Sequence, residues 1–185
     1  MRFPKLTKRK TITALIVLII SILTQFIVPN PAKQIKSKPS PLLSAPNFSK
    51  VTRVIDGDTI EIETGQKVRY IGIDTPELHS PKKEVQCFAQ EAFLKNKELV
   101  EGKVIKLEKD VSETDKYGRL LRYVYLQEKN SSTAAIFVNN YLVDNGYAYA
   151  ASFPPDIKFA DLFRQSQEKA RTSIFGLWNN CPIIH

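Results

Sequence analysis

Three short clusters of charged residues are the parts of this sequence that could do chemistry. They are Asp56-Gly57-Asp58-Thr59, the stretch from Arg69 to Glu77, and the stretch from Thr114 to Arg119. Taken singly, each is typical of a turn or strand end with solvated charges. Taken together, they supply carboxylates, which bind hard divalent cations, and arginines, which hold a phosphate with two N–H groups. Such a set could act on a phosphate ester.

The spacing inside each cluster adds to this interpretation. An Asp-Gly hairpin turn needs no second carboxylate, so Asp58 is available as a cation ligand. In the second cluster, Arg69 lies on a predicted strand that Asp74 ends, and Pro76 keeps Thr75 out of helical geometry. In the third cluster, a charged turn leads into a strand that begins at Arg119.

The order and spacing of the clusters resemble those of the staphylococcal nuclease (thermonuclease) family. The matching motifs read D-G-D-T, R-x-x-x-x-D-T-P-E and D-K-Y-G-R, and the resemblance covers roughly residues 51–178. It implies an OB-type barrel with three helices, and a monomeric nuclease that depends on Ca²⁺. It also implies that DNA and RNA are both substrates and that cleavage leaves 5′-hydroxyl and 3′-phosphate ends.

The resemblance also implies a role for each matching residue. Asp58 and Asp74 would be calcium carboxylates, and Thr75 would add its backbone carbonyl. Glu77 would either accept the proton of the attacking water or hold that water in line. The remaining expected residues are the catalytic Arg69 and Arg119, the substrate-phosphate contacts Lys116 and Tyr117, and the nucleic-acid contacts Lys82 and Lys83.

Two features depart from the family pattern or fall outside it. The aromatic residues after residue 146 are shifted, so Tyr149 or Phe153 could either stack on a base or pack against the protein. His79 lies two residues after Glu77 and could act as a general base, but a loop histidine is usually solvated. We expect Trp178 to cap the last helix.

Hydrophobic patterning predicts an α+β protein built mainly on β-structure, a five-stranded OB-fold barrel with three packed helices. Alternation of apolar and polar residues marks the strands, and apolar stripes ended by glycines mark the helices. A helix at 133–145 would take Ser132 or Thr133 as its N-cap. The expected strands are Val51–Asp56, Thr59–Glu63, Lys67–Ile73, Val104–Glu108 and Arg119–Leu126, and the expected helices are Cys87–Glu101, Thr133–Asn145 and Pro155–Thr172.

The net charge of +8 does not belong to this expected domain. Residues 1–50 hold nine lysines and arginines and no acid, which leaves 18 basic and 19 acidic residues in the rest of the chain. Binding of nucleic acid must therefore depend on individually placed residues and not on bulk charge.

The N-terminus has the composition of an export signal. Five positive charges precede an uncharged, Ile- and Leu-rich run at residues 11–28. As a helix, this run would measure roughly 27 Å, just under the ~30 Å of a bilayer core. A cleaved signal and a retained membrane anchor both remain open, and either would place the domain outside the cytoplasm. We therefore expect a signal or anchor at 1–32, a Pro/Lys/Ser linker at 33–49, the nuclease-like domain at 50–180 and a tail at 181–185.

The chain has two cysteines, Cys87 and Cys181. An even number of cysteines in an exported chain favours one disulfide, although two buried thiols are the alternative.

A second class of function also fits a barrel of this kind. The domain could be a non-catalytic nucleic-acid-binding OB-fold module tethered at the membrane. Barrels of that kind usually lack the catalytic residues, whereas Arg69, Glu77 and Arg119 are all present here.

Overall fold

The computed structural model describes residues 47–78, 84–126 and 135–181. Contacts divide the chain after Leu43, and every described residue belongs to the second unit, Ser44–His185. The expected signal segment, most of the linker, His79, Lys82 and Lys83 lie outside the described ranges. Within those ranges, no helix combines the length and apolar character needed to cross a bilayer.

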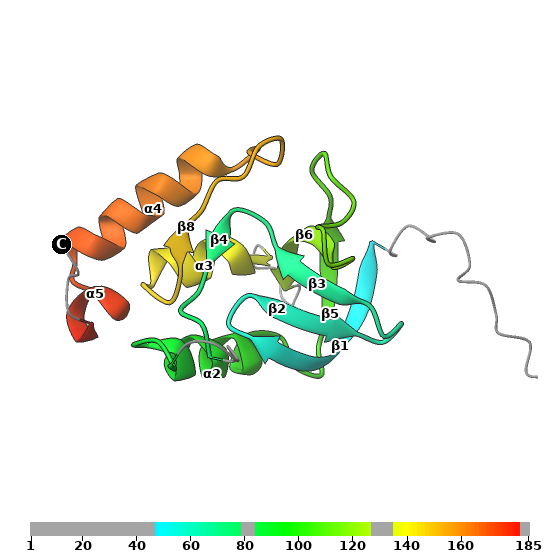
Figure 1. The fold of residues 1–185 in the computed structure, drawn as a ribbon, viewed down its shortest axis with the longest axis horizontal. Helices are drawn as coiled ribbons and strands as arrows, with labels where there is room; N and C mark the ends of the chain where they lie inside the picture. The colour runs from blue at the N-terminus through cyan, green and yellow to red at the C-terminus, as the bar shows by residue number, and fades with distance from the viewer. Residues whose placement is uncertain (1–46, 79–83, 127–134, 182–185) are drawn as a thin grey trace, which may run out of the picture. The chain divides into compact units, whose positions relative to one another are not determined.

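Five strands form a closed barrel (Figure 1). Neighbouring strands pair antiparallel in the order β3-β2-β1-β5-β6, and a parallel pairing of β3 with β6 closes the ring. The expected OB-type barrel is therefore confirmed. The strands are β1 (Phe48–Asp56), β2 (Thr59–Ile62), β3 (Lys67–Tyr70), β5 (Val104–Glu108) and β6 (Leu120–Leu126).

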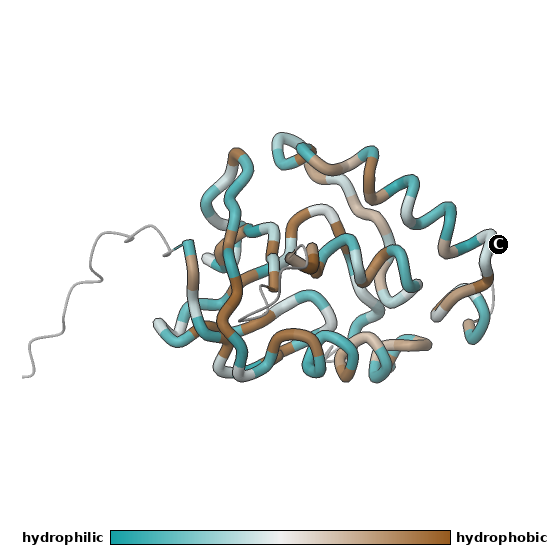
Figure 2. The backbone as a smooth tube through the Cα atoms, turned by 180° about the vertical axis from the view of Figure 1, so that it is seen from behind, coloured by the Kyte–Doolittle hydropathy of each residue, from teal (hydrophilic) through white to brown (hydrophobic). Residues whose placement is uncertain are grey.

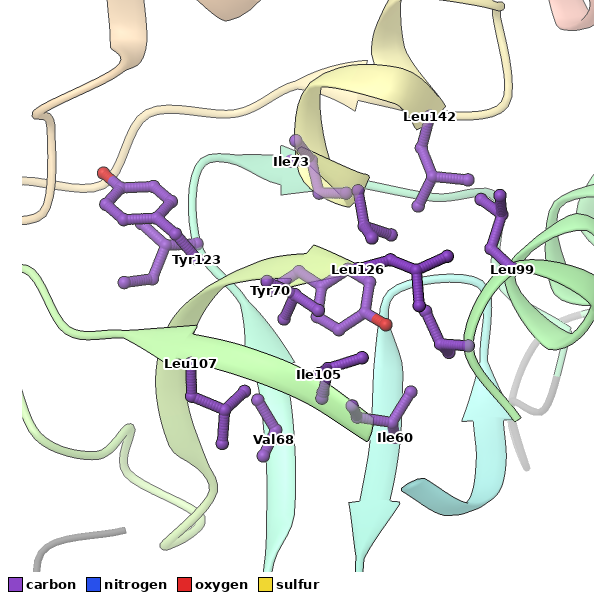
Figure 3. Close-up of a cluster of buried hydrophobic side chains, with 14 of the residues drawn as sticks. Ile60, Val68, Tyr70, Ile73, Leu99, Ile105, Leu107, Tyr123, Leu126 and Leu142 are labelled. Carbon is purple, nitrogen blue, oxygen red and sulfur yellow. The ribbon is translucent and has the colours of Figure 1, made fainter. Parts of the chain in front are cut away.

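Alternating side chains fill the barrel. In β5, Ile105 and Leu107 are buried while Val104 and Lys106 are exposed, so one face of the strand points inward. The same alternation is visible as changes of hydropathy along the strands in Figure 2. Side chains from the strands meet Leu99 and Leu142 in one continuous core (Figure 3). Burying each such side chain contributes about 1.5–3 kcal/mol, so this core is the main stabilising element of the fold.

Three helices and one short helical turn cover the barrel (Figure 1). α2 is tied to the β1–β2 hairpin, because its buried Asn96 accepts a hydrogen bond from the Tyr70 hydroxyl (2.9 Å) and donates one to the Asp56 carbonyl (3.2 Å). A small second sheet pairs β4 with β8. The helices are α2 (Ala89–Val100), α3 (Val138–Asp144), α4 (Ala160–Thr172) and α5 (Leu177–Asn180), and the short strands are β4 (Ile73–Asp74), β7 (Ile136–Phe137) and β8 (Tyr149–Ala150).

The strand expected at 67–73 is broken into two. β3 ends at Tyr70, and Gly72 has φ +78°, a left-handed conformation that interrupts the strand before β4. A Cβ on Gly72 would lie 2.4 Å from the Phe163 ring, so this glycine also permits close packing of α4. The break turns Asp74 away from the line of β3 and into a separate sheet with β8.

The helices expected at 133–145 and 155–172 begin later than the pattern indicates. Ile136 and Phe137 pair with β6 as β7, so α3 starts at Val138, and the expected caps Ser132 and Thr133 lie outside the described residues. α4 starts at Ala160, because Asp156 accepts hydrogen bonds from the N–H groups of Val111 and Ser112 and holds the preceding segment in a turn. Similarly, α2 starts at Ala89, after Phe88 in a left-handed conformation (φ 67°).

A buried asparagine joins α3 to the barrel. The Asn139 side chain accepts a hydrogen bond from Val124 N (2.9 Å) and donates one to the Ile71 carbonyl (2.9 Å). Asn139 is fully buried. Its side chain therefore supplies hydrogen bonds that water cannot supply to these two backbone groups.

We expect Asn139→Ala to lower the free energy of unfolding by roughly 2–4 kcal/mol, because two buried backbone groups lose their partner. Urea unfolding followed by circular dichroism measures this loss. Asn179→Ala, at an exposed position, is the matched control and should be nearly neutral. An equal effect of the two substitutions would show that the Asn139 bridge contributes nothing.

Candidate active site

One cavity of about 320 Å³ is lined by residues from all three charged clusters. The structure thus brings together six of the residues that the sequence singled out. Lys116 and Tyr117 line a neighbouring cavity of about 460 Å³, which shares Arg69 and Arg119 with the first. The first cavity contains Asp58, Arg69, Asp74, Thr75, Glu77 and Arg119, together with Ile55, Asp56, Thr59 and Lys67.

Asp58 is the most firmly held acid in this active-site cavity. Its side chain is almost fully buried, and one carboxylate oxygen accepts hydrogen bonds from Thr75 N and Thr75 Oγ1, both at 2.9 Å. The other oxygen accepts from Thr59 Oγ1 at 3.0 Å. The carboxylate is therefore fixed by the chain on both sides of the cavity.

Gly57 makes this arrangement possible. A Cβ at this position would lie 2.6 Å from Thr75 Oγ1, closer than atoms can approach without displacement. The Asp-Gly pair is therefore more than a hairpin turn, because the missing side chain lets Thr75 approach Asp58.

Arg69 is held in a fixed position by backbone carbonyls and carboxylates. Its Nη1 donates to the carbonyls of Tyr70 and Ile73, both at 2.8 Å. Its Nη2 lies 2.7 Å from Asp74 Oδ1 and 3.2 Å from Asp58 Oδ2. The guanidinium thus joins the two predicted cation ligands and sits at the wall between the two cavities.

Arg119 is oriented by an acid that the sequence argument did not single out. Asp115 accepts hydrogen bonds from Arg119 Nε (2.6 Å) and Arg119 N (3.0 Å). The guanidinium carbon lies 5.6 Å from the centre of the Tyr117 ring, and Lys116 Nζ lies 5.0 Å from the same centre. Both cations therefore flank an aromatic ring that is 73% exposed.

Negative charge is concentrated on the opposite wall of the active-site cavity. Burial raises the pKa of Asp56 from 3.8 to about 7, and a hydrogen bond with Glu77 and the charges of Asp58 and Glu77 raise it as well. Burial also raises the pKa of Asp74, where the nearby Arg69 acts in the opposite direction. Burial is the main cause of both shifts, so these two carboxyl groups lie where water reaches them poorly.

The donor set fits a hard divalent cation. Asp58 and Asp74 supply carboxylates, and Thr75 follows directly with a backbone carbonyl, so all the available donors are oxygens. Among the described residues, no three His, Cys, Asp or Glu side chains form a ready-made metal cluster. A cation held here would therefore need water or a bound phosphate to complete its coordination.

Glu77 is positioned by a residue that sequence reasoning missed. Gln86 Oε1 accepts a hydrogen bond from Glu77 N at 2.8 Å, and Gln86 N donates to the Glu77 carbonyl at 3.1 Å. The next residue, Cys87, forms a disulfide with Cys181, and the two Cα atoms lie 5.8 Å apart. The chain bearing Glu77 is thus fastened to the start of α2 and to the C-terminal end of α5.

The loop that bears Lys116, Tyr117 and Arg119 is anchored by a buried arginine. Arg122 is 3% exposed and pairs with the Glu113 carboxylate, and it also donates to the Glu113 carbonyl (3.1 Å). Glu108 forms an ion pair with Lys158, and Asp110 accepts a hydrogen bond from the Tyr123 hydroxyl. These acids therefore serve the fold.

Asp56, Asp115 and Gln86 are the site residues that sequence reasoning missed. Asp56 stands in the first motif, so its spacing from Asp58 was a usable signal. Asp115 likewise lies within the third motif. Gln86 gives no such signal, because its hydrogen bond to Glu77 is a contact that no motif predicts.

Comparison with known proteins identifies a family and several relatives. The family described as "Staphylococcal nuclease homologue" matches residues 67–180. Endonuclease YncB of Bacillus subtilis is 39% identical over 137 residues, which cover 71% of this chain and 62% of the relative. Thermonuclease of Staphylococcus hyicus is 36% identical over 134 residues, covering 71% and 75%. Thermonuclease of Staphylococcus intermedius is 37% identical over 131 residues, covering 69% and 74%.

We expect Glu113→Gln to destabilise the protein by roughly 1–3 kcal/mol at neutral pH, because buried Arg122 loses its charged partner. Burial works against ionisation of Glu113, but its bonds to Arg122 and Lys109 hold its pKa below the ordinary 4.5. Because the pKa of Glu113 is lower in the folded state than in the unfolded state, its ionised form stabilises the protein at pH values above the unfolded-state pKa. This contribution disappears as the pH falls through the folded-state pKa.

The difference in unfolding free energy between wild type and Glu113→Gln should therefore shrink as the pH is lowered from 7 towards 3. Urea titrations at several pH values measure it, with the exposed Glu168→Gln as control. A difference that stays constant over this range would contradict the role assigned to the ionised Glu113.

Proposed function

We propose that this chain, which belongs to the staphylococcal nuclease family and is hence a nuclease, hydrolyses the phosphodiester bonds of DNA and RNA in a Ca²⁺-dependent reaction. The observation that supports this most directly is the single cavity in which Arg69, Arg119 and Glu77 face the carboxylates Asp58 and Asp74. The chain spans less than two thirds of Endonuclease YncB, so the proposal concerns the domain shared by the two proteins.

The arginines bind the reacting phosphate. As water attacks, negative charge grows on the phosphate oxygens, and fixed cations stabilise that charge. Arg119 is held by Asp115 and Arg69 by two carbonyls, so both guanidinium groups are oriented before substrate enters. Arginine suits the role because it stays protonated and can donate two parallel hydrogen bonds.

Glu77 acts on the attacking water. Its carboxylate lines the same cavity as both arginines, and its backbone is held by Gln86. The side chain either accepts the proton of the water or holds the water in line with the phosphorus. Asp56 forms a side-chain hydrogen bond with Glu77 and therefore lies next to this carboxylate.

Asp58, Asp74 and the Thr75 carbonyl would hold Ca²⁺. When bound, the ion supplies Lewis-acid polarisation of the phosphate and neutralises the carboxylates. The geometry supports this assignment, because the carboxylates of Asp58 and Asp74 lie 3.2 and 2.7 Å from the same Arg69 Nη2 atom and therefore stand close together.

The neighbouring cavity receives the nucleoside attached to the bound phosphate. Tyr117 is exposed on one wall, Phe153 is 67% exposed on another, and both rings offer faces on which a base can stack. Lys116 is placed to contact a phosphate at the end of this cavity. By analogy with the family, we propose that cleavage leaves 5′-hydroxyl and 3′-phosphate ends and that the protein acts as a monomer.

We also propose that the protein is exported, and is either released or retained at the membrane by residues 11–28. The basic flank and apolar run of the N-terminus support export. The Cys87–Cys181 disulfide adds support, because disulfides persist in oxidising compartments.

We expect the full chain to cut single-stranded DNA in Ca²⁺ and to lose this activity in excess chelator. Glu77→Gln should lower kcat by roughly 10²–10⁴-fold, because a group that assists proton transfer is removed. A fluorescence-quenched oligonucleotide assay measures both effects. The exposed Glu91→Gln is the control and should leave kcat unchanged.

The alternative, a binding module without catalysis, makes the opposite prediction. The folded chain would then bind the oligonucleotide and leave it intact in Ca²⁺, and Glu77→Gln would change nothing. Equal cutting by wild type and Glu77→Gln would instead remove Glu77 from the mechanism.

We expect Gln86→Ala to lower kcat by roughly 10- to 100-fold with little change in KM, because a displaced Glu77 would no longer meet the attacking water. Gln86→Glu keeps an oxygen that can accept from Glu77 N, and should retain most of the activity. Steady-state kinetics of the three proteins tests this. A change confined to KM would show that Gln86 contributes to substrate binding and not to the position of Glu77.

A further inference from the structure

A third cavity, of about 620 Å³, adjoins the active site. It lies between the start of α2, β8 and α5, and it shares Asp74 with the active-site cavity. Of the residues in the nuclease motifs, only Asp74 and Pro76 line it. The roles that the resemblance implies for the motif residues therefore do not explain this cavity.

The position of the third cavity relative to the proposed phosphate site suggests a role for this cavity. The cavity that contains Tyr117 and Phe153 meets the active site at Arg69 and Arg119, whereas the third cavity meets it at Asp74. In Figure 1, the loop before β6 and helix α5 lie on opposite sides of β4, the strand that ends in Asp74. A phosphodiester has a nucleoside on each side, so a strand that passes through the active site needs room in both directions.

The walls of the third cavity match an uncharged aromatic ligand. Tyr149 is 38% exposed and stands directly opposite Asp74 in the β4–β8 pair. The Trp178 ring meets it edge-on, with the ring centres 5.5 Å apart, and Val85 adds exposed apolar surface. Stacking on such a ring contributes about 1–3 kcal/mol per base and does not depend strongly on which base is bound.

Charge excludes a phosphate from the same place. Asp74 and Glu84 line the cavity, and its described lining contains no lysine or arginine. A phosphate would therefore meet carboxylates without a compensating cation, whereas a base and its sugar are neutral. The occupant that the walls favour is a nucleoside whose phosphate lies back in the active site.

The cavity is also held open by the fold. Leu177 N donates to the Gly146 carbonyl at 2.9 Å, where the backbones cross so closely that a Cβ on Gly146 would lie 2.2 Å from Phe175 O. The Cys87–Cys181 disulfide joins the α2 side of the cavity to the α5 side. A site that is formed in advance loses little free energy to ordering when a ligand binds.

We propose that this cavity binds the second nucleoside of the scissile diester, with its base stacked on Tyr149. The inference rests on the proposed nuclease function and adds to it, because two nucleoside sites flanking one phosphate site allow cutting within a strand. Tyr149 would then set the preference for internal over terminal bonds.

Thymidine dinucleotides test the proposal, because each contains one phosphodiester. The full chain is assayed in Ca²⁺ with the intact dinucleotide and with two analogues that lack either the 5′-side or the 3′-side base. We expect removal of one particular base to lower kcat/KM of the wild type by about tenfold, the loss that corresponds to one stacking contact. Tyr149→Ala should cut the intact dinucleotide about tenfold more slowly than the wild type. Its kcat/KM should not fall further when that base is absent. Tyr149→Phe keeps the ring and should behave as wild type.

The comparison is made between substrates within each variant, so a partly unfolded Tyr149→Ala preparation does not change the ratio of rates. If Tyr149→Ala loses as much on removal of each base as the wild type does, the ring contacts neither base and the proposal is wrong. Wild-type rates with Tyr149→Ala on the intact dinucleotide would overturn it as well. If the wild type cuts neither the dinucleotides nor long single-stranded DNA, the nuclease function itself fails.

Discussion

Negative charge around Arg69 is the constraint that organises this protein. Asp58 and Asp74 both lie within ion-pair distance of its Nη2, and Asp56 and Glu77 share the same cavity. One guanidinium carries a single positive charge. Burial is the main cause that raises the pKa of Asp56 and of Asp74, and the nearby charge of Asp58 raises both further. A cation bound by the carboxylates would release Arg69 Nη2 for an incoming phosphate.

The barrel supplies the rigidity that such a charge cluster requires. Repelling carboxylates move apart unless the backbone under them is fixed. Asp56 ends β1 of the closed barrel and Asp58 follows in the β1–β2 turn, whereas Asp74 lies in β4, which pairs with β8. The seam between β3 and β6 places Arg69 next to Leu121, two residues from Arg119. Closure of the barrel is therefore what brings two distant motifs to one cavity. The Tyr70–Asn96–Asp56 bonds extend the same support to the β1–β2 turn.

The sequence predicted the barrel and the grouping of the three motifs, because alternation and motif spacing are local signals. It failed where tertiary contacts override local patterns. Ile136 and Phe137 fit a helix by composition, but they complete a sheet by pairing with β6. The left-handed Gly72 splits a run of residues that suits a strand, since α4 packs against it. Gln86 could not be predicted at all, because its role depends on a hydrogen bond to Glu77 that no motif marks.

The Cys87–Cys181 bond has a topological consequence. The two cysteines are 94 residues apart, so the bond encloses β5, β6, α3 and α4 in a single covalent ring. Arg119 and Tyr149 lie inside this ring, whereas Arg69 and Glu77 lie on the open segment before it. If a protease cut the ring once, the two pieces would stay joined through the sulfurs and could keep the halves of the active site together. A single break inside the ring would thus leave one covalently joined molecule, whereas the same break would separate an unbridged chain into fragments.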